Sequence, residues 1–103
     1  YGEQRRLEVA IALAAEPRLL LLDEPAAGLN PEEGQRLVSI IRKVRDRGVT
    51  VLLVEHHMRV VMGVCDRIVV LDHGALIAEG APRDVANDAN VIRVYLGREQ
   101  AHA

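Results

Sequence analysis

Two clusters of ionisable side chains follow directly after apolar runs, and these are the residues best placed to do chemistry. Asp23 and Glu24 come straight after four leucines, and Glu55 and His56 follow the apolar run 49–54. A carboxylate in such a place can hold a hard cation such as Mg²⁺. A second one can polarise a water molecule for attack on a phosphoryl group. The pattern therefore indicates phosphate chemistry, with solvated or structurally bonded side chains at strand ends as the alternative.

The elements that carry these residues are typical of a parallel α/β sheet. Residues 19–22 are an unbroken apolar run, and 49–54 (VTVLLV) are apolar apart from Thr50 and rich in β-branched residues, as expected of buried strands. Between them we predict a helix over 31–47, with Asn30 as its N-cap and Glu33 completing a capping box. Strand, helix and strand form a βαβ unit, and ligands of such sheets bind beyond the carboxyl ends of the strands. The two ionisable clusters are therefore expected to share one edge of the sheet.

The flanking segments predict further helices and one hairpin. Residues 3–15 place small and aliphatic side chains on one helix face, namely Leu7, Ala10, Ile11 and Ala14. The other predicted elements are a short helix through 60–64, a hairpin of strands 67–72 and 75–79, a helix from Pro82, and a last helix capped by Asn87 or Asp88.

Length and composition exclude several classes of protein. The chain has 103 residues, enough for one small domain, and a net charge of −2, which argues against nucleic acid as a partner. It has two tyrosines and neither phenylalanine nor tryptophan, so surfaces for stacking bases are scarce. The single cysteine, Cys65, cannot form an internal disulfide, and no apolar run reaches the roughly 18 residues of a membrane span.

Gly2 and the histidines are weaker indications. A glycine at a helix start leaves backbone N–H groups free at the positive end of the helix dipole, which suits an anion, although Gly2 could equally be a plain cap. His57 is expected to be a solvent-facing neighbour of His56. The spacing of acidic, histidine and cysteine residues matches neither a zinc site nor an EF-hand.

Taken together, these segments resemble the C-terminal part of an ABC-type ATPase subunit. Residues 1–5 (YGEQR) are similar to the tail of the ABC signature, and 19–25 (LLLLDEP) to Walker B with its adjacent glutamate. Residues 27–30 (AGLN) lie where the D-loop falls, and His56 lies where the switch histidine falls. The stretches YGEQRRLEVA, DEPAAGLNP and VEHHMRVVMGVCDRIVVLDHG resemble the ATP-binding subunit of bacterial branched-chain amino-acid importers. The stretch VIRVYLG belongs to the same resemblance, although the helix that ends in VYLG is shared with lipopolysaccharide-export ATPases, which remain the alternative.

The resemblance implies a role for each matching residue. Asp23 would help to hold Mg²⁺, Glu24 would be the general base, and His56 would contact the γ-phosphate of ATP. The residues implied in contacts with ATP or at the dimer interface are Tyr1, Gly2, Glu3, Gln4 and Asn30. Two of these depart from the family pattern, because Glu3 replaces the usual signature glutamine and Asn30 replaces the usual D-loop aspartate.

The resemblance also implies an architecture and partners. The fold would be α/β, a partial P-loop NTPase core of parallel strands and crossover helices with a C-terminal β-hairpin and short helices. Residues 1–97 would belong to the nucleotide-binding domain and 98–103 would be a tail. The implied partners are a second ATP-binding subunit arranged head to tail, membrane permease subunits and, indirectly, a periplasmic solute-binding protein. The place of action would be the cytoplasmic face of the bacterial inner membrane.

Neither the phosphate loop GxxxxGK[ST] nor the family's glutamine loop occurs in these 103 residues. We therefore expect the chain to be a piece of something longer that binds ATP weakly and hydrolyses none unaided. Two other hypotheses are a non-catalytic interaction module and a receiver-like phosphate-handling domain. The second needs a lysine beyond a late strand, whereas the only lysine, Lys43, lies in the predicted helix 31–47.

Overall fold

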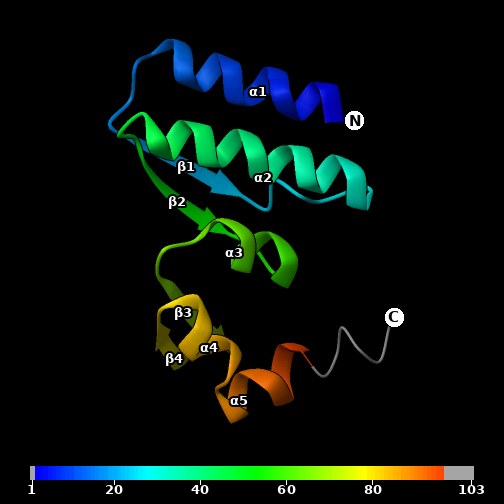
Figure 1. Ribbon diagram of the computed structural model, residues 1–103, viewed down its shortest axis with the longest axis vertical. Helices are drawn as coiled ribbons and strands as arrows, with labels where there is room; N and C mark the ends of the chain where they lie inside the picture. Colours follow the sequence, from blue (N-terminus) through cyan, green and yellow to red (C-terminus); the bar gives the residue numbers. More distant parts are fainter. Residues whose placement is uncertain (1, 97–103) are drawn as a thin grey trace. The chain divides into compact units, whose positions relative to one another are not determined.

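The computed structural model describes residues 2–96, which form two compact units divided between Val64 and Cys65 (Figure 1). The first unit contains α1 (Gly2–Ala14), β1 (Leu19–Asp23), α2 (Pro31–Asp46), β2 (Thr50–Val54) and α3 (Met58–Val64). The second contains β3 (Ile68–Asp72), β4 (Ala75–Gly80), α4 (Pro82–Ala86), α5 (Ala89–Val91) and a π-helical turn (Ile92–Leu96). Tyr1 and the predicted tail 98–103 lie outside the described residues. Across 2–96, no helix combines the length and apolarity needed to cross a bilayer.

The βαβ unit predicted from the two apolar runs is confirmed. β1 and β2 pair in parallel, from Leu19 opposite Thr50 to Asp23 opposite Val54, and α2 connects them (Figure 1). The capping box at the start of α2 is also confirmed. Asn30 Oδ1 accepts from the Glu33 N–H at 2.8 Å, and the Asn30 N–H donates to Glu33 Oε1 at 3.2 Å. This box fixes the path by which the chain leaves β1 and enters the helix.

The core of the first unit lies where α2 and α3 pack together. Its buried apolar side chains are Val9, Leu20, Ala26, Leu37, Ile41, Val44, Met58, Val60, Val61 and Val64. Two arginines of α2 fasten the end of α3: Arg42 Nε donates to the Gly63 carbonyl at 2.8 Å and Arg45 Nη1 to the Val64 carbonyl at 2.6 Å. These cations complement the negative end of the α3 dipole. As a result, α3 and the segment that leads into it are held against α2.

The prediction that both strands are buried on both faces is wrong for the described chain. Side chains alternate along each strand, and the face that carries Leu20 is covered. The opposite face is 51–64% exposed at Leu19, Leu21, Leu52 and Val54. The reason is that the described helices of this unit cover only one side of the two-stranded sheet. An unbroken apolar run indicates burial, but it does not say which segment provides the cover.

The apolar face predicted for the first helix is also exposed. Leu7 and Ile11 of α1 are 60% and 64% exposed, and Ala10 and Ala14 share this exposure. Val9, on another side of α1, is the buried residue. The helix itself forms as predicted and ends before Pro17.

The second unit follows the sequence prediction closely. β3 and β4 form an antiparallel hairpin, with a register shift between Val70 and Leu71. Its two turn residues, His73 and Gly74, have φ angles of 49° and 80°, as a type I′ turn requires. α4 begins without a side-chain cap at Ala81, whereas the Asp88 side chain caps α5.

Candidate functional site

The carboxyl ends of β1 and β2 lie side by side, and their hydrogen bonding continues one residue beyond the strands. The Glu24 N–H donates to the Val54 carbonyl at 2.7 Å. Glu24 then leaves the strand direction with a φ of 48°, in the left-handed region. For a residue other than glycine this conformation costs about 1–2 kcal/mol. Backbone strain of this kind is characteristic of functional positions, and here it sets the direction of the Glu24 side chain.

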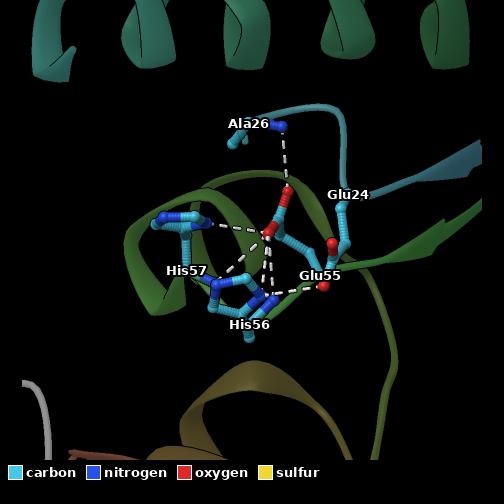
Figure 2. A network of polar contacts seen from close by, with 5 residues as sticks. All are labelled: Glu24, Ala26, Glu55, His56 and His57. Atoms are coloured by element: carbon cyan, nitrogen blue, oxygen red, sulfur yellow. Dashed lines mark hydrogen bonds and ion pairs between the residues drawn. The ribbon is translucent and has the colours of Figure 1, made fainter. Parts of the chain in front are cut away.

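The structure brings Glu24 and His56 into direct contact. His56 Nδ1 lies 3.2 Å from Glu24 Oε1, and both side chains are about half exposed (Figure 2). An ionised carboxylate only accepts hydrogen bonds, so Nδ1 is the donor whenever Glu24 is charged. Asp23, the last residue of β1, is exposed. Within residues 2–96, no hydrogen bond joins its carboxylate to this pair.

Glu55 lies at the centre of the same network, with its side chain entirely buried (Figure 2). Its Oε2 accepts from the Ala26 N–H at 3.0 Å. Its Oε1 accepts from the His56 N–H at 3.0 Å and from His57 Nδ1 at 2.9 Å. Burial by itself would raise the pKa of the Glu55 carboxyl, but the hydrogen bonds from His57, His56 and Ala26 together bring this pKa below its ordinary value of 4.5. Glu55 is therefore a buried, charged acceptor that connects two loops.

His57 is nearly half exposed, as predicted for a solvent-facing neighbour of His56, but its ring is also bonded to Glu55, which the sequence did not indicate. The centroids of the His57 and His56 rings are 4.4 Å apart. One ligand atom each of Glu55, His56 and His57 lies within 4.8 Å of the others, a spacing that would also admit a metal ion. The hydrogen bonds of the Glu55 carboxylate are sufficient to explain this closeness.

We expect the lowered pKa of Glu55 to make stability depend on acid pH. A carboxyl whose pKa is lower in the folded state stabilises the fold above its unfolded pKa. That contribution is lost as the pH falls from about 4.5, the ordinary value, through the lower pKa of the folded state. Denaturant unfolding of the protein at several pH values between 7 and 3 measures the effect. The Glu55→Gln variant, which cannot titrate at this position, should show a shallower decline; an identical slope would contradict the prediction.

The residues of the predicted signature and D-loop lie at a second place in the same unit. Gly2 begins α1, and Glu3 and Gln4 are exposed in its first turn, while Tyr1 lies outside the described residues. A hollow of about 180 Å³ is lined by residues that include Glu3, Leu29 and Glu33, so the start of α1 faces the start of α2. Asn30 caps α2 with its side-chain oxygen.

Comparison with known proteins finds similar chains among ATP-binding cassette proteins. A family model for branched-chain amino acid ATP-binding cassette transporters matches residues 75–101. BraF of Pseudomonas aeruginosa, a high-affinity branched-chain amino acid transport ATP-binding protein, is 51% identical over 98 residues, covering 94% of this chain and 38% of BraF. The crystal structure of the ADP conformation of MJ1267, an ATP-binding cassette of an ABC transporter, matches with a TM-score of 0.82 and 29% identity, covering 93% of this chain and 39% of MJ1267. Over nearly its whole length, the chain is similar to ATP-binding cassette proteins.

Similarity within the ATP-binding cassette family extends to two named groups. LivG of Escherichia coli, another high-affinity branched-chain amino acid transport ATP-binding protein, is 49% identical over 98 residues and is covered to 38%. The lipopolysaccharide export ATP-binding protein LptB of Haemophilus influenzae is 46% identical over 98 residues and is covered to 41%. The chain thus spans about two fifths of the length of these relatives. The predicted fold class, a partial ATP-binding cassette core of α/β type, is confirmed.

Proposed function

We propose that this ATP-binding cassette chain is part of the ATP-hydrolysing subunit of a bacterial importer of branched-chain amino acids. The observation that carries the proposal is the contact between Glu24 and His56 at the ends of two parallel strands, 3.2 Å apart. The match of 75–101 to the branched-chain family model favours this solute class over lipopolysaccharide. The similarity to LptB keeps lipopolysaccharide export as the second candidate.

In the proposed reaction, Glu24 accepts a proton from the water molecule that attacks the γ-phosphate of ATP. His56 holds the Glu24 carboxylate through Nδ1 and presents its other ring nitrogen to the phosphate. Because both side chains are about half exposed, water and a phosphate group can reach them. A positioned general base of this kind contributes roughly 10²- to 10⁴-fold to the rate.

Asp23 fits the role of a Mg²⁺ ligand. It is an exposed carboxylate at the end of β1, directly before the proposed base, and oxygen ligands of this type suit a hard cation. When bound, Mg²⁺ neutralises charge on the phosphates. The Glu55 side chain, in contrast, has no exposed surface and already accepts hydrogen bonds at both oxygens, so we assign it no metal.

We further propose that the start of α1 serves a second subunit. Exposed backbone N–H groups at a helix start favour a phosphate, so Gly2, Glu3 and Gln4, with Tyr1 before them, would contact ATP held by a head-to-tail partner. Asn30 would lie at that interface, because it ends the loop between β1 and α2.

Residues 1–97 would then belong to one nucleotide-binding domain followed by a tail. Permease subunits and, through them, a periplasmic binding protein complete the proposed complex at the cytoplasmic face of the inner membrane.

The experiment that tests this proposal compares the 103-residue chain with the complete gene product that carries it. These residues hold no GxxxxGK[ST] loop, and that loop supplies most of the phosphate binding in P-loop ATPases. We expect Mg²⁺-dependent phosphate release from the complete product and none above background from the chain alone. An inactive complete product would overturn the proposed function. Clear hydrolysis by the chain alone would instead overturn the dependence on that loop.

A further inference from the structure

We propose that Glu55 is a positioning residue that holds Glu24 and His56 at their working separation. This inference rests on the proposed function, because it concerns the pair to which ATP hydrolysis is assigned. Glu55 itself need not touch ATP, since its side chain has no exposed surface. Its effect on the reaction would pass through the backbone of the two loops that it joins.

The first argument is where the carboxylate is attached. Oε2 accepts from the Ala26 N–H at 3.0 Å, two residues beyond Glu24 on the loop after β1. Oε1 accepts from the His56 N–H at 3.0 Å, on the loop after β2. One rigid group therefore bonds to the backbone on both sides of the contact between Glu24 and His56 (Figure 2). Moving either loop would break a charged hydrogen bond.

The second argument is burial. A half-exposed carboxylate exchanges its partners with water and fixes little, whereas an entirely buried one must keep its donors or carry an unsatisfied charge. Ala26 is buried as well, so the loop on the Glu24 side is held by packing and by the Glu55 bond together. Only a carboxylate accepts at two oxygens, because an amide offers one oxygen and one donor group. Glutamine could not make both backbone contacts.

The third argument is the contribution of His57. Its Nδ1 lies 2.9 Å from Glu55 Oε1, and a carboxylate acceptor requires the proton on that nitrogen. The His57 backbone N–H donates to the same oxygen at 3.4 Å. These contacts keep the Glu55 side chain in the conformation that reaches Ala26 and His56. His57 thus affects Glu24 and His56 indirectly, by holding the Glu55 side chain in place.

The test is steady-state ATP hydrolysis and ATP binding by variants of the complete gene product. Glu55→Gln should lower kcat roughly 10- to 100-fold, the usual cost of misplacing catalytic groups, with ATP affinity unchanged within about threefold. The matched control is Ile41→Val, a buried core change in α2 that loosens the fold without touching the network. It should lower the unfolding temperature and leave kcat within about twofold of the original protein. Equal kcat losses in the two variants would overturn the inference.

Two further measurements separate positioning from general damage. If Glu55 acts through His56, combining Glu55→Gln with His56→Ala should slow turnover by less than the product of the two single effects. His57→Phe keeps an aromatic ring but removes the donor, so it should lower kcat, and His57→Asn, whose amide can replace the Nδ1 donor, should restore most of it. This pair decides the question if Glu55→Gln does not fold. Multiplying effects in the double variant, or normal kcat in His57→Phe, would overturn the inference. An inactive unmodified protein would instead reject the proposed function.

Discussion

Replacing Glu24 by glutamine in the complete gene product should reduce ATP turnover roughly 10²- to 10⁴-fold while ATP still binds. Glutamine has nearly the same shape and can still accept a hydrogen bond from His56 Nδ1, now 3.2 Å from the Glu24 carboxylate. It cannot take a proton from water. It also meets no greater backbone strain at a φ of 48° than glutamate does. The variant therefore removes the chemistry of the base and preserves the local geometry. Phosphate release and equilibrium binding of ATP measure the two quantities separately.

Glu32→Gln is the matched control for this variant. Glu32 lies in the first turn of α2, is exposed, and forms an ion pair with Arg36 at 3.5 Å on the surface. Surface pairs of this kind contribute little to stability, so turnover should stay within about twofold. A Glu24→Gln protein with the turnover of the Glu32→Gln protein would remove Glu24 from the role of base. Loss of ATP binding in Glu24→Gln would likewise contradict the expected separation of binding from chemistry.

Local patterns were sufficient to predict most of the fold. The capping box at Asn30 and Glu33 is a short-range device, and it forms as the spacing predicts. The turn at His73 and Gly74 is equally local. What local patterns could not supply is the neighbour that covers an apolar surface. The apolar residues of β1 and β2 predict a doubly buried sheet, yet Leu21 and its neighbours are exposed in the described chain, because burial depends on segments that a run of apolar residues does not specify.

The candidate site was predictable only in part, for a similar reason. Strand ends in a parallel sheet share one edge, so the meeting of Glu24 and His56 followed from topology. The role of Glu55 could not be predicted in this way. Its donors are backbone N–H groups of two loops, and no residue type in the sequence indicates where such groups will lie. The one indication in the sequence was the position of Glu55, directly after an apolar strand and directly before two histidines. A charge in that position must find several donors, and His57 is one of them.

His56→Ala is the second change expected to have a large effect, and it should lower kcat roughly 10²- to 10³-fold, the usual cost of removing one group that stabilises a developing charge. The variant loses the contact to Glu24 Oε1 and the ring nitrogen proposed to face the phosphate. The backbone N–H of residue 56 remains and can still donate to Glu55, so the loop should keep its place. ATP affinity should therefore change by much less than turnover, because phosphate binding draws on many other groups.

His73→Ala is the matched histidine control. His73 is in the hairpin turn of the second unit, and its side chain is 88% exposed. Within residues 2–96, its ring forms an ion pair only with Asp72. Removing it deletes an imidazole of the same kind at a place with no proposed role in hydrolysis, so turnover should be unchanged. If His56→Ala and His73→Ala retained equal turnover, the contact between Glu24 and His56 would be a structural hydrogen bond at a strand end. Glu24 would then have to orient its water molecule without that ring.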